Sequence, residues 1–125
     1  MSTVNVTEDT FTQTIENNDI VIVDAWANWC EPCKAFSPIF EKASEKHSDI
    51  TFAKLDTEAN PGLTAALQVV SIPTLIVFRE GIHLGEQVGA LRPGELEELI
   101  DQIRNIDMEE VHRDIAKQND QQGEN

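Results

Sequence analysis

Asp24-Ala-Trp-Ala-Asn-Trp-Cys-Glu-Pro-Cys-Lys34 holds the only two cysteines in this chain of 125 residues. Cys30 and Cys33 lie between the apolar run Ile20-Val21-Ile22-Val23 and a segment with helical spacing. Two cysteines placed after a strand and at the start of a helix form a dithiol that can close to a disulfide and open again. The stretch therefore predicts an α/β protein with thiol–disulfide exchange as its chemistry.

The helix expected after the cysteine pair favours the reactive form of the first cysteine. The thiolate is the nucleophile, and the unpaired N–H groups and positive dipole end of a helix stabilise such an anion. Pro32 donates no N–H and is tolerated in a first helical turn. We expect Cys30 to attack a substrate disulfide and Cys33 to resolve the mixed disulfide.

Two other uses of the cysteine pair were weighed against exchange. Half of a zinc site is one, but zinc requires four ligands, and the histidines His47, His83 and His112 are isolated and widely spaced. A pair of inert core cysteines is the other. We prefer exchange to both interpretations.

Composition and charge restrict the class of protein. A chain of 125 residues with 40% hydrophobic residues fits one domain that buries its own core without staples. Nine Lys and Arg against 23 Asp and Glu give a net charge of −14, which disfavours nucleic acid and anionic lipid as partners. The N-terminus does not resemble a signal peptide, and the apolar runs are too short to span a membrane. We therefore expect a cytoplasmic protein, where a cysteine pair is catalytic or metal-binding rather than structural.

Hydrophobic periodicity predicts alternating strands and helices. Strands are expected at Val4–Val6, Ile20–Val23, Thr51–Leu55, Leu75–Phe78 and, at an edge, Ile82–Val88; helices are expected at Phe11–Ile15, Lys34–His47, Pro61–Val69 and from Arg92 to Ile106. This order predicts an α/β sandwich with a mixed sheet. No linker divides residues 1–106 into smaller domains.

Residues 107–125 form an acidic extension of different composition. Val111 and Ile115 are spaced to prolong the last helix by a turn or two. The segment from Gln118 to Asn125 has no apolar residue, so we expect it to be disordered. A contact surface for a partner or a second copy is the alternative role of the extension.

Three motifs closely resemble the thioredoxin family. The first is Trp29-Cys30-Glu31-Pro32-Cys33-Lys34, which is preceded by Val23-Asp24. The second and third are Ile72-Pro73-Thr74 and Val88-Gly89-Ala90. The resemblance spans Val21 to Ile106. It implies the three-layer thioredoxin fold, with a central mixed sheet of five strands, four helices and an extended last helix. It also implies a protein-disulfide reductase in cell redox homeostasis that binds no cofactor. Electrons would come from NADPH through thioredoxin reductase, and the substrates would be disulfide-containing proteins.

The resemblance assigns the proton chemistry and the backbone next to the cysteines. Cys30 matches the attacking cysteine and Cys33 the resolving one. Asp24 ends a buried strand, where burial raises the pKa of a carboxyl and suits it to proton exchange with Cys33. Lys54 matches the lysine near that carboxyl, and Pro73 matches the cis-proline beside the cysteines. Without the resemblance, Asp24 could cap a turn and Lys54 could be a surface lysine.

The resemblance also implies a substrate groove. The N–H and C=O groups of Ile72 would pair with an extended substrate segment, as in strand addition. Trp29, Ile72, Gly89 and Ala90 would form its apolar rim, where a side chain at Gly89 would block a close backbone approach. A core position is the alternative for Trp29, although Trp26 lies nearer the buried strand.

Glu31 departs from the family pattern, in which Gly usually follows the first cysteine. An anion near the sulfur disfavours the thiolate and raises the pKa of Cys30, so we expect a stronger reductant. A glutamate in a first helical turn also stabilises the helix. The alternative is a tolerated surface residue.

Two functions of other kinds remain as alternatives. A non-catalytic binding subunit or holdase could use the same groove, but it would not need Cys33, Asp24 and Pro73 together, as exchange does. A dedicated oxidase or isomerase would need an oxidising compartment and usually a stabilised thiolate. We expect a monomeric, general protein disulfide reductase.

Overall fold

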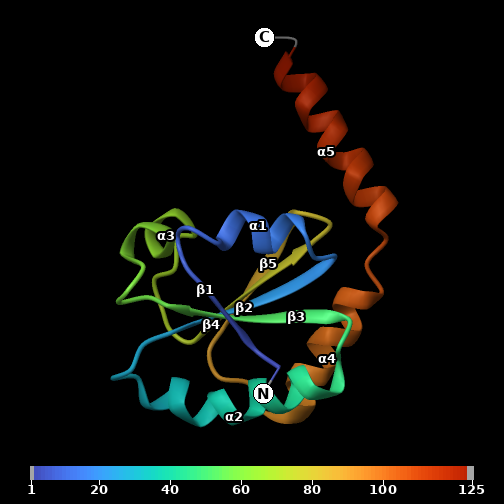
Figure 1. Ribbon diagram of the computed structural model, residues 1–125. Helices are drawn as coiled ribbons and strands as arrows, with labels where there is room; N and C mark the ends of the chain where they lie inside the picture. The colour runs from blue at the N-terminus through green and yellow to red at the C-terminus, as the bar shows by residue number, and fades with distance from the viewer. Residues whose placement is uncertain (1, 124–125) are drawn as a thin grey trace.

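Five strands and five helices make up residues 2–123, which are the residues that the computed structural model describes. Along the chain they are β1 (Val4–Val6), α1 (Phe11–Glu16), β2 (Ile20–Trp26), α2 (Glu31–Lys46), β3 (Ile50–Asp56), α3 (Pro61–Ala66), β4 (Thr74–Arg79), β5 (Ile82–Val88), α4 (Pro93–Arg104) and α5 (Met108–Gly123). The sheet lies between α1 and α3 on one face and α2 and α4 on the other (Figure 1). The predicted three-layer α/β architecture is confirmed.

The sheet is mixed and has the strand order β1-β3-β2-β4-β5. Its β1, β3 and β2 run parallel, whereas β4 is antiparallel to both β2 and β5. The continuous apolar run of β2 suits its central place, because a strand covered on both faces buries every side chain. The predicted edge position of Ile82–Val88 is confirmed. The carboxyl end of β2 therefore leads from the middle of the sheet into the cysteine motif.

Two apolar cores fill the space on the two faces of the sheet. The core under α2 and α4 contains Ile20, Ile22, Phe36, Phe40, Ile50, Phe52, Leu96 and Ile100; the core under α1 and α3 contains Val6, Ile15, Val21, Val23, Ala53 and Leu55. Successive strand residues point to opposite faces, so Asp24 continues the α2 side of β2, and Lys54 continues the α2 side of β3. These two residues are register partners.

Helix α2 begins directly after Cys30, which confirms the expected places of Glu31 and Pro32 in a first helical turn. Cys30 is its N-cap, with an extended backbone at φ −91° and ψ 110°, and its sulfur accepts a hydrogen bond from the N–H of Cys33. Pro32 fits the first turn because that turn needs no intrahelical N–H donor there. The helix thus starts three residues before the apolar helical spacing that begins at Lys34, and both cysteines belong to its N-terminal end.

The C-terminal extension is a separate helix, so the expected prolongation of the last helix is wrong. Helix α4 ends at Arg104, where Arg79 donates to the carbonyl oxygen of Ile103 at 2.9 Å. Helix α5 starts anew at Met108, and the carboxylate of Asp107 caps it by accepting the N–H groups of the second and third helical residues.

Disorder was expected for residues 118–125, but α5 continues as a helix to Gly123 and projects from the body of the molecule (Figure 1). Residues 124–125 lie outside the described part of the chain. A functional division between 1–106 and 107–125 stays a prediction. No helix within residues 2–123 combines the length and the apolar character needed to cross a bilayer.

Candidate active site

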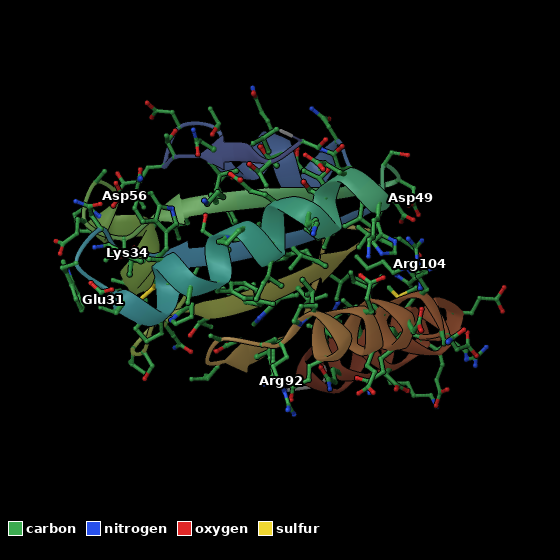
Figure 2. All side chains as sticks on the ribbon, turned by 90° about the horizontal axis from the view of Figure 1, so that it is seen from below. Glu31, Lys34, Asp49, Asp56, Arg92 and Arg104 are labelled. Carbon is green, nitrogen blue, oxygen red and sulfur yellow. A yellow bond between two sulfur atoms is a disulfide. The ribbon has the colours of Figure 1, made fainter. Side chains whose placement is uncertain are left out.

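A disulfide joins Cys30 and Cys33 at the N-terminal end of α2, as the sulfur bond beside Glu31 shows in Figure 2. Their Cα atoms are 5.2 Å apart, and both residues are buried. The N–H of Cys33 donates to Cys30 Sγ at 3.2 Å. When the disulfide opens, this N–H and the helix N-terminus are already placed to stabilise a Cys30 thiolate.

The loop before β4 lies directly against the disulfide. The peptide bond between Ile72 and Pro73 is cis, as the resemblance implied, and Cys30 Sγ is 3.8 Å from the carbonyl oxygen of Ile72. The N–H of Gly89 donates to the carbonyl oxygen of Pro73 at 2.8 Å, which ties the end of β5 to the same loop. The cysteine motif therefore contacts the loop before β4, and the end of β5 is tied to that same loop.

Gly89 is required by its backbone conformation. Its φ is +98°, a region that residues with a side chain rarely adopt, whereas a Cβ built on it would meet nothing within 4 Å. The need for glycine inside this chain is thus conformational. A close approach by a substrate backbone, the reason expected from the sequence, stays a prediction.

Trp29 is a surface residue, so a core position for it is wrong. It is 67% exposed, and its indole N–H donates to the carboxylate of Glu58. Trp26 is half-buried and packs against the cluster of Ala27, Cys30 and Cys33, which confirms it as the better core candidate. The exposed indole of Trp29 leaves a flat apolar surface beside the disulfide.

Two valines near this surface were missed by the sequence analysis. Val70 is 94% exposed in the loop that leads to Ile72, and Val88 is 58% exposed just before Gly89. Ala90, which the resemblance placed in the rim, is also exposed. A valine in a sequence ordinarily indicates a core or strand position, so only the fold reveals that these two face solvent.

Asp24 is a buried acid with a perturbed pKa. It is 1% exposed, and its Oδ1 has no hydrogen-bond partner among the described residues. Burial raises the pKa of its carboxyl to about 7, while the positive charge of Lys54 acts in the opposite direction. Asp24 lies within β2, so the alternative that it caps a turn is wrong.

A cavity of about 130 Å³ is lined by both Asp24 and Cys33. Its lining residues are Asp24, Trp26, Ala27, Asn28, Cys33, Lys34, Ser37 and Lys54. A space of this size with several polar groups can hold water. The cavity therefore brings the buried acid and the second cysteine of the pair to one enclosed space.

Lys54 directs its ammonium into the same cavity. Nζ donates to Ser37 Oγ at 2.8 Å and lies 5.8 Å from the centre of the Trp26 ring. Lys54 is half-buried, and so are Ser37 and Trp26, the two residues near its ammonium, which argues against an ordinary surface lysine. Ser37 was missed by the sequence analysis, since a serine in the second turn of an amphipathic helix carries no signal of its own.

Glu31 lies at the surface, beside the disulfide. Its side chain is 83% exposed and is paired with Lys34 Nζ at 3.3 Å (Figure 2). Water and the neighbouring ammonium screen its charge, so its effect on the Cys30 sulfur is small. Pro32, next in the chain, is exposed as well.

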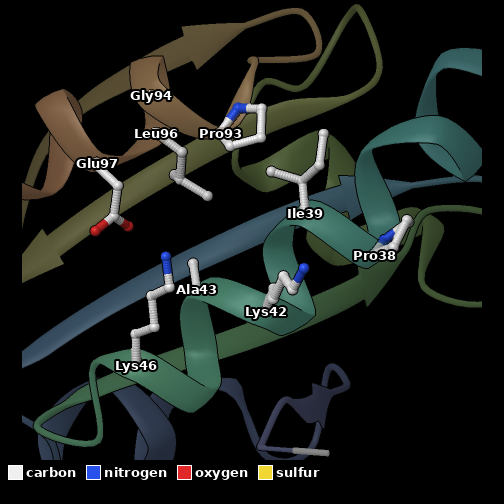
Figure 3. Close-up of a pocket in the computed structure, with 9 residues that line it drawn as sticks. All are labelled: Pro38, Ile39, Lys42, Ala43, Lys46, Pro93, Gly94, Leu96 and Glu97. Atoms are coloured by element: carbon white, nitrogen blue, oxygen red, sulfur yellow. The ribbon is translucent and has the colours of Figure 1, made fainter.

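A larger hollow than the one beside Asp24 lies elsewhere. A cavity of about 440 Å³ lies between α2 and α4 (Figure 3), and it is lined by Pro38, Ile39, Lys42, Ala43, Lys46, Pro93, Gly94, Leu96 and Glu97. None of the predicted site residues lines it. In the described part of the chain, no group of three or more His, Cys, Asp or Glu residues could hold a metal ion.

Comparison with known proteins finds similarity to thioredoxins. Residues 2–105 match the family model described as Thioredoxin. The "Putative thioredoxin 2" of Streptomyces coelicolor is 46% identical over 98% of this chain and 91% of that protein. A "Bifunctional thioredoxin reductase/thioredoxin" of Mycobacterium leprae is 41% identical over 83% of this chain and 23% of that protein. A solved thioredoxin of Plasmodium falciparum has a TM-score of 0.75 and 32% identity, covering 79% of this chain and 97% of that one.

A disulfide at a helix N-terminus, presented by the carboxyl end of a central strand, makes this chain a thiol–disulfide oxidoreductase. The comparisons narrow that class: the chain belongs to the thioredoxin family and is a protein-disulfide reductase. Proteins of this family need no bound cofactor for the exchange.

Proposed function

We propose that Cys30 is the attacking cysteine and Cys33 the resolving one. The Cys30 thiolate attacks one sulfur of a substrate disulfide, which forms a mixed disulfide and releases the other substrate sulfur as a thiolate. The Cys33 thiolate then attacks Cys30 Sγ, which releases the second substrate thiolate and leaves the Cys30–Cys33 disulfide. Two electrons pass to the substrate. The observation that supports this order is the hydrogen bond from the Cys33 N–H to Cys30 Sγ.

Asp24 is the base that accepts the proton of Cys33 in this proposal. A base works best when its pKa lies near the working pH, and burial raises the pKa of Asp24 to about 7. The shared cavity gives the proton a short path between the two side chains. Lys54 provides a nearby positive charge that favours the ionised acid.

The substrate is an extended segment of a disulfide-containing protein. The carbonyl of Ile72 beside Cys30 Sγ supports backbone pairing with such a segment next to the reacting sulfur. A preference for apolar side chains in the substrate segment is supported by four exposed apolar residues, Trp29, Val70, Val88 and Ala90. Gly89 leaves space for the substrate backbone.

Electrons reach the disulfide from NADPH through a thioredoxin reductase. The Mycobacterium leprae relative supports this donor, because its name joins thioredoxin reductase and thioredoxin in one protein. Exchange driven by NADPH requires a reducing compartment, so we propose the cytoplasm. Self-repulsion at a net charge of −14 supports action as a monomer.

Insulin reduction in the presence of dithiothreitol tests the proposed function. The native protein should accelerate precipitation of the insulin chains, and Cys30→Ser should reduce that rate to the level of dithiothreitol alone. Ser44→Ala serves as the control, since Ser44 lies on α2 and outside the cavity. No acceleration by the native protein, or full activity of Cys30→Ser, would refute the proposed exchange, whereas a cysteine-free variant that keeps the biological activity would favour a non-catalytic binding protein.

A further inference from the structure

Asp24 and Lys54 are side by side in the sheet and yet do not form an ion pair in the described structure. They are register partners on two parallel strands, so their side chains lie on the same face. The four-carbon stem of a lysine is long enough to reach across one strand spacing. Instead, the buried Asp24 Oδ1 has no hydrogen-bond partner among residues 2–123.

Ser37 accounts for the position of the ammonium. It lies on α2, one turn after Cys33, and its half-buried hydroxyl accepts the Lys54 Nζ–H at 2.8 Å. The Trp26 ring, 5.8 Å from Nζ, adds a weaker attraction. These two groups hold the cation at the α2 side of the cavity.

We propose that Ser37 is a positioning residue that holds Lys54 away from Asp24 and so keeps Asp24 able to bind and release a proton at neutral pH. An ammonium in contact with a carboxylate would stabilise the anion and lower its pKa. A weaker base would take the proton of Cys33 less readily. The inference rests on the proposed role of Asp24 as that base.

The charged and titratable groups around Asp24 come from two elements. Lys54 is on β3, and Cys33 and Lys34 are on α2. On the other neighbouring strand, β4, the register partner of Asp24 is the apolar Leu75. Lys34 is engaged with the exposed Glu31, so Lys54 is the cation whose position Ser37 controls.

The test is the carbon-13 NMR titration of the Asp24 carboxyl in the oxidised protein, where neither cysteine titrates. In Ser37→Ala the midpoint should fall by about one pH unit or more, a tenfold or larger loss of proton affinity. Ser37→Thr retains the hydroxyl and should keep the native midpoint. Ser44→Ala, on the same helix and outside the cavity, is the matched control.

The same substitution in a Lys54→Gln background tests whether Lys54 causes the shift of the Asp24 midpoint. In Lys54→Gln, which has no ammonium to release, Ser37→Ala should leave the midpoint where it is. An unchanged or raised midpoint in Ser37→Ala alone, or an equal fall in the Lys54→Gln background, would overturn the inference. Full exchange activity of Asp24→Asn would instead refute the proposed base while leaving the Ser37 titration result intact.

Discussion

Cys30 Sγ lies 3.8 Å from the carbonyl oxygen of Ile72. The sulfur that reacts and the backbone that is proposed to hold the substrate therefore share one surface. Three exposed apolar side chains, Trp29, Val70 and Val88, come from the same three segments of the chain as Cys30, Ile72 and Gly89. Because the chain carries a net charge of −14, we expect these apolar side chains to favour apolar substrate segments at the disulfide.

Val70→Ser should lower kcat/KM for reduction of a protein substrate about threefold to tenfold. The valine is 94% exposed, and partial burial of such a side chain on binding contributes on the order of 1 kcal/mol. Steady-state insulin reduction measures the change. Val4→Ser is the matched control, because Val4 is 45% exposed on β1 at the opposite edge of the sheet. Equal losses in the two variants would show that Val70 does not contact the substrate.

Gly89→Ala should destabilise the fold by roughly 1–2 kcal/mol, the cost of placing a side chain in a left-handed backbone conformation. The residue has a φ of +98°. Urea denaturation gives the free energy of unfolding. Gly85→Ala, on β5 just before Gly89, is the control, since a Cβ there also meets nothing within 4 Å and its φ is not in the left-handed range. The same cost at both positions would rule out conformation as the reason for glycine at 89.

Asp24→Asn should stabilise the protein at high pH and have little effect at low pH. The folded-state pKa of Asp24 is raised from 3.8 to about 7, so ionisation is easier in the unfolded chain. The native free energy of unfolding should therefore fall as pH rises from about 4 to about 7, by an amount on the order of 4 kcal/mol. Urea denaturation across this range measures it.

In Asp24→Asn the part of this fall that belongs to the buried acid should disappear. Asp9→Asn, at an exposed turn, should keep the native dependence on pH. A parallel pH dependence in the native protein and Asp24→Asn would mean that Asp24 is already ionised without penalty in the fold.

Glu31→Gln should make the reduction potential less negative by about 10–20 mV. Removing the carboxylate removes its electrostatic repulsion of the Cys30 thiolate and so stabilises the reduced form. The shift is small since the side chain is 83% exposed and paired with Lys34. It should shrink further in high salt. Equilibration with glutathione or another redox couple measures the potential, and Glu45→Gln, exposed near the far end of α2, is the control. Equal potentials for the native protein and Glu31→Gln would leave Glu31 without a redox role.

The elements of the domain and much of the site could be predicted because their signals are local. The β-branched run of β2 and the spacing of Cys30 and Cys33 are visible in short windows of sequence, and so is the dipeptide of Ile72 and Pro73. The start of α5 was missed because the cap formed by Asp107 competes with continuation of α4, and spacing alone does not decide between them.

The remaining site residues could not be predicted because their surroundings come from distant segments. Ser37 acquires its role only when β3 places Lys54 opposite its hydroxyl. Valine is a residue type that usually lies in the core, so only the fold shows that Val70 and Val88 are exposed. The sequence likewise does not show that the Asp24 Oδ1 lacks a partner.

Trapping of the mixed disulfide tests the order of attack most directly. Cys33→Ser, incubated in the reduced state with a disulfide-containing protein, should accumulate a covalent adduct through Cys30 that dithiothreitol releases. Cys30→Ser should form far less, because the N–H of Cys33 donates to the sulfur of residue 30 and is therefore placed to stabilise a thiolate at Cys30. Peptide mapping by mass spectrometry locates the linkage. Adducts forming as fast through Cys33 as through Cys30 would contradict the proposed order.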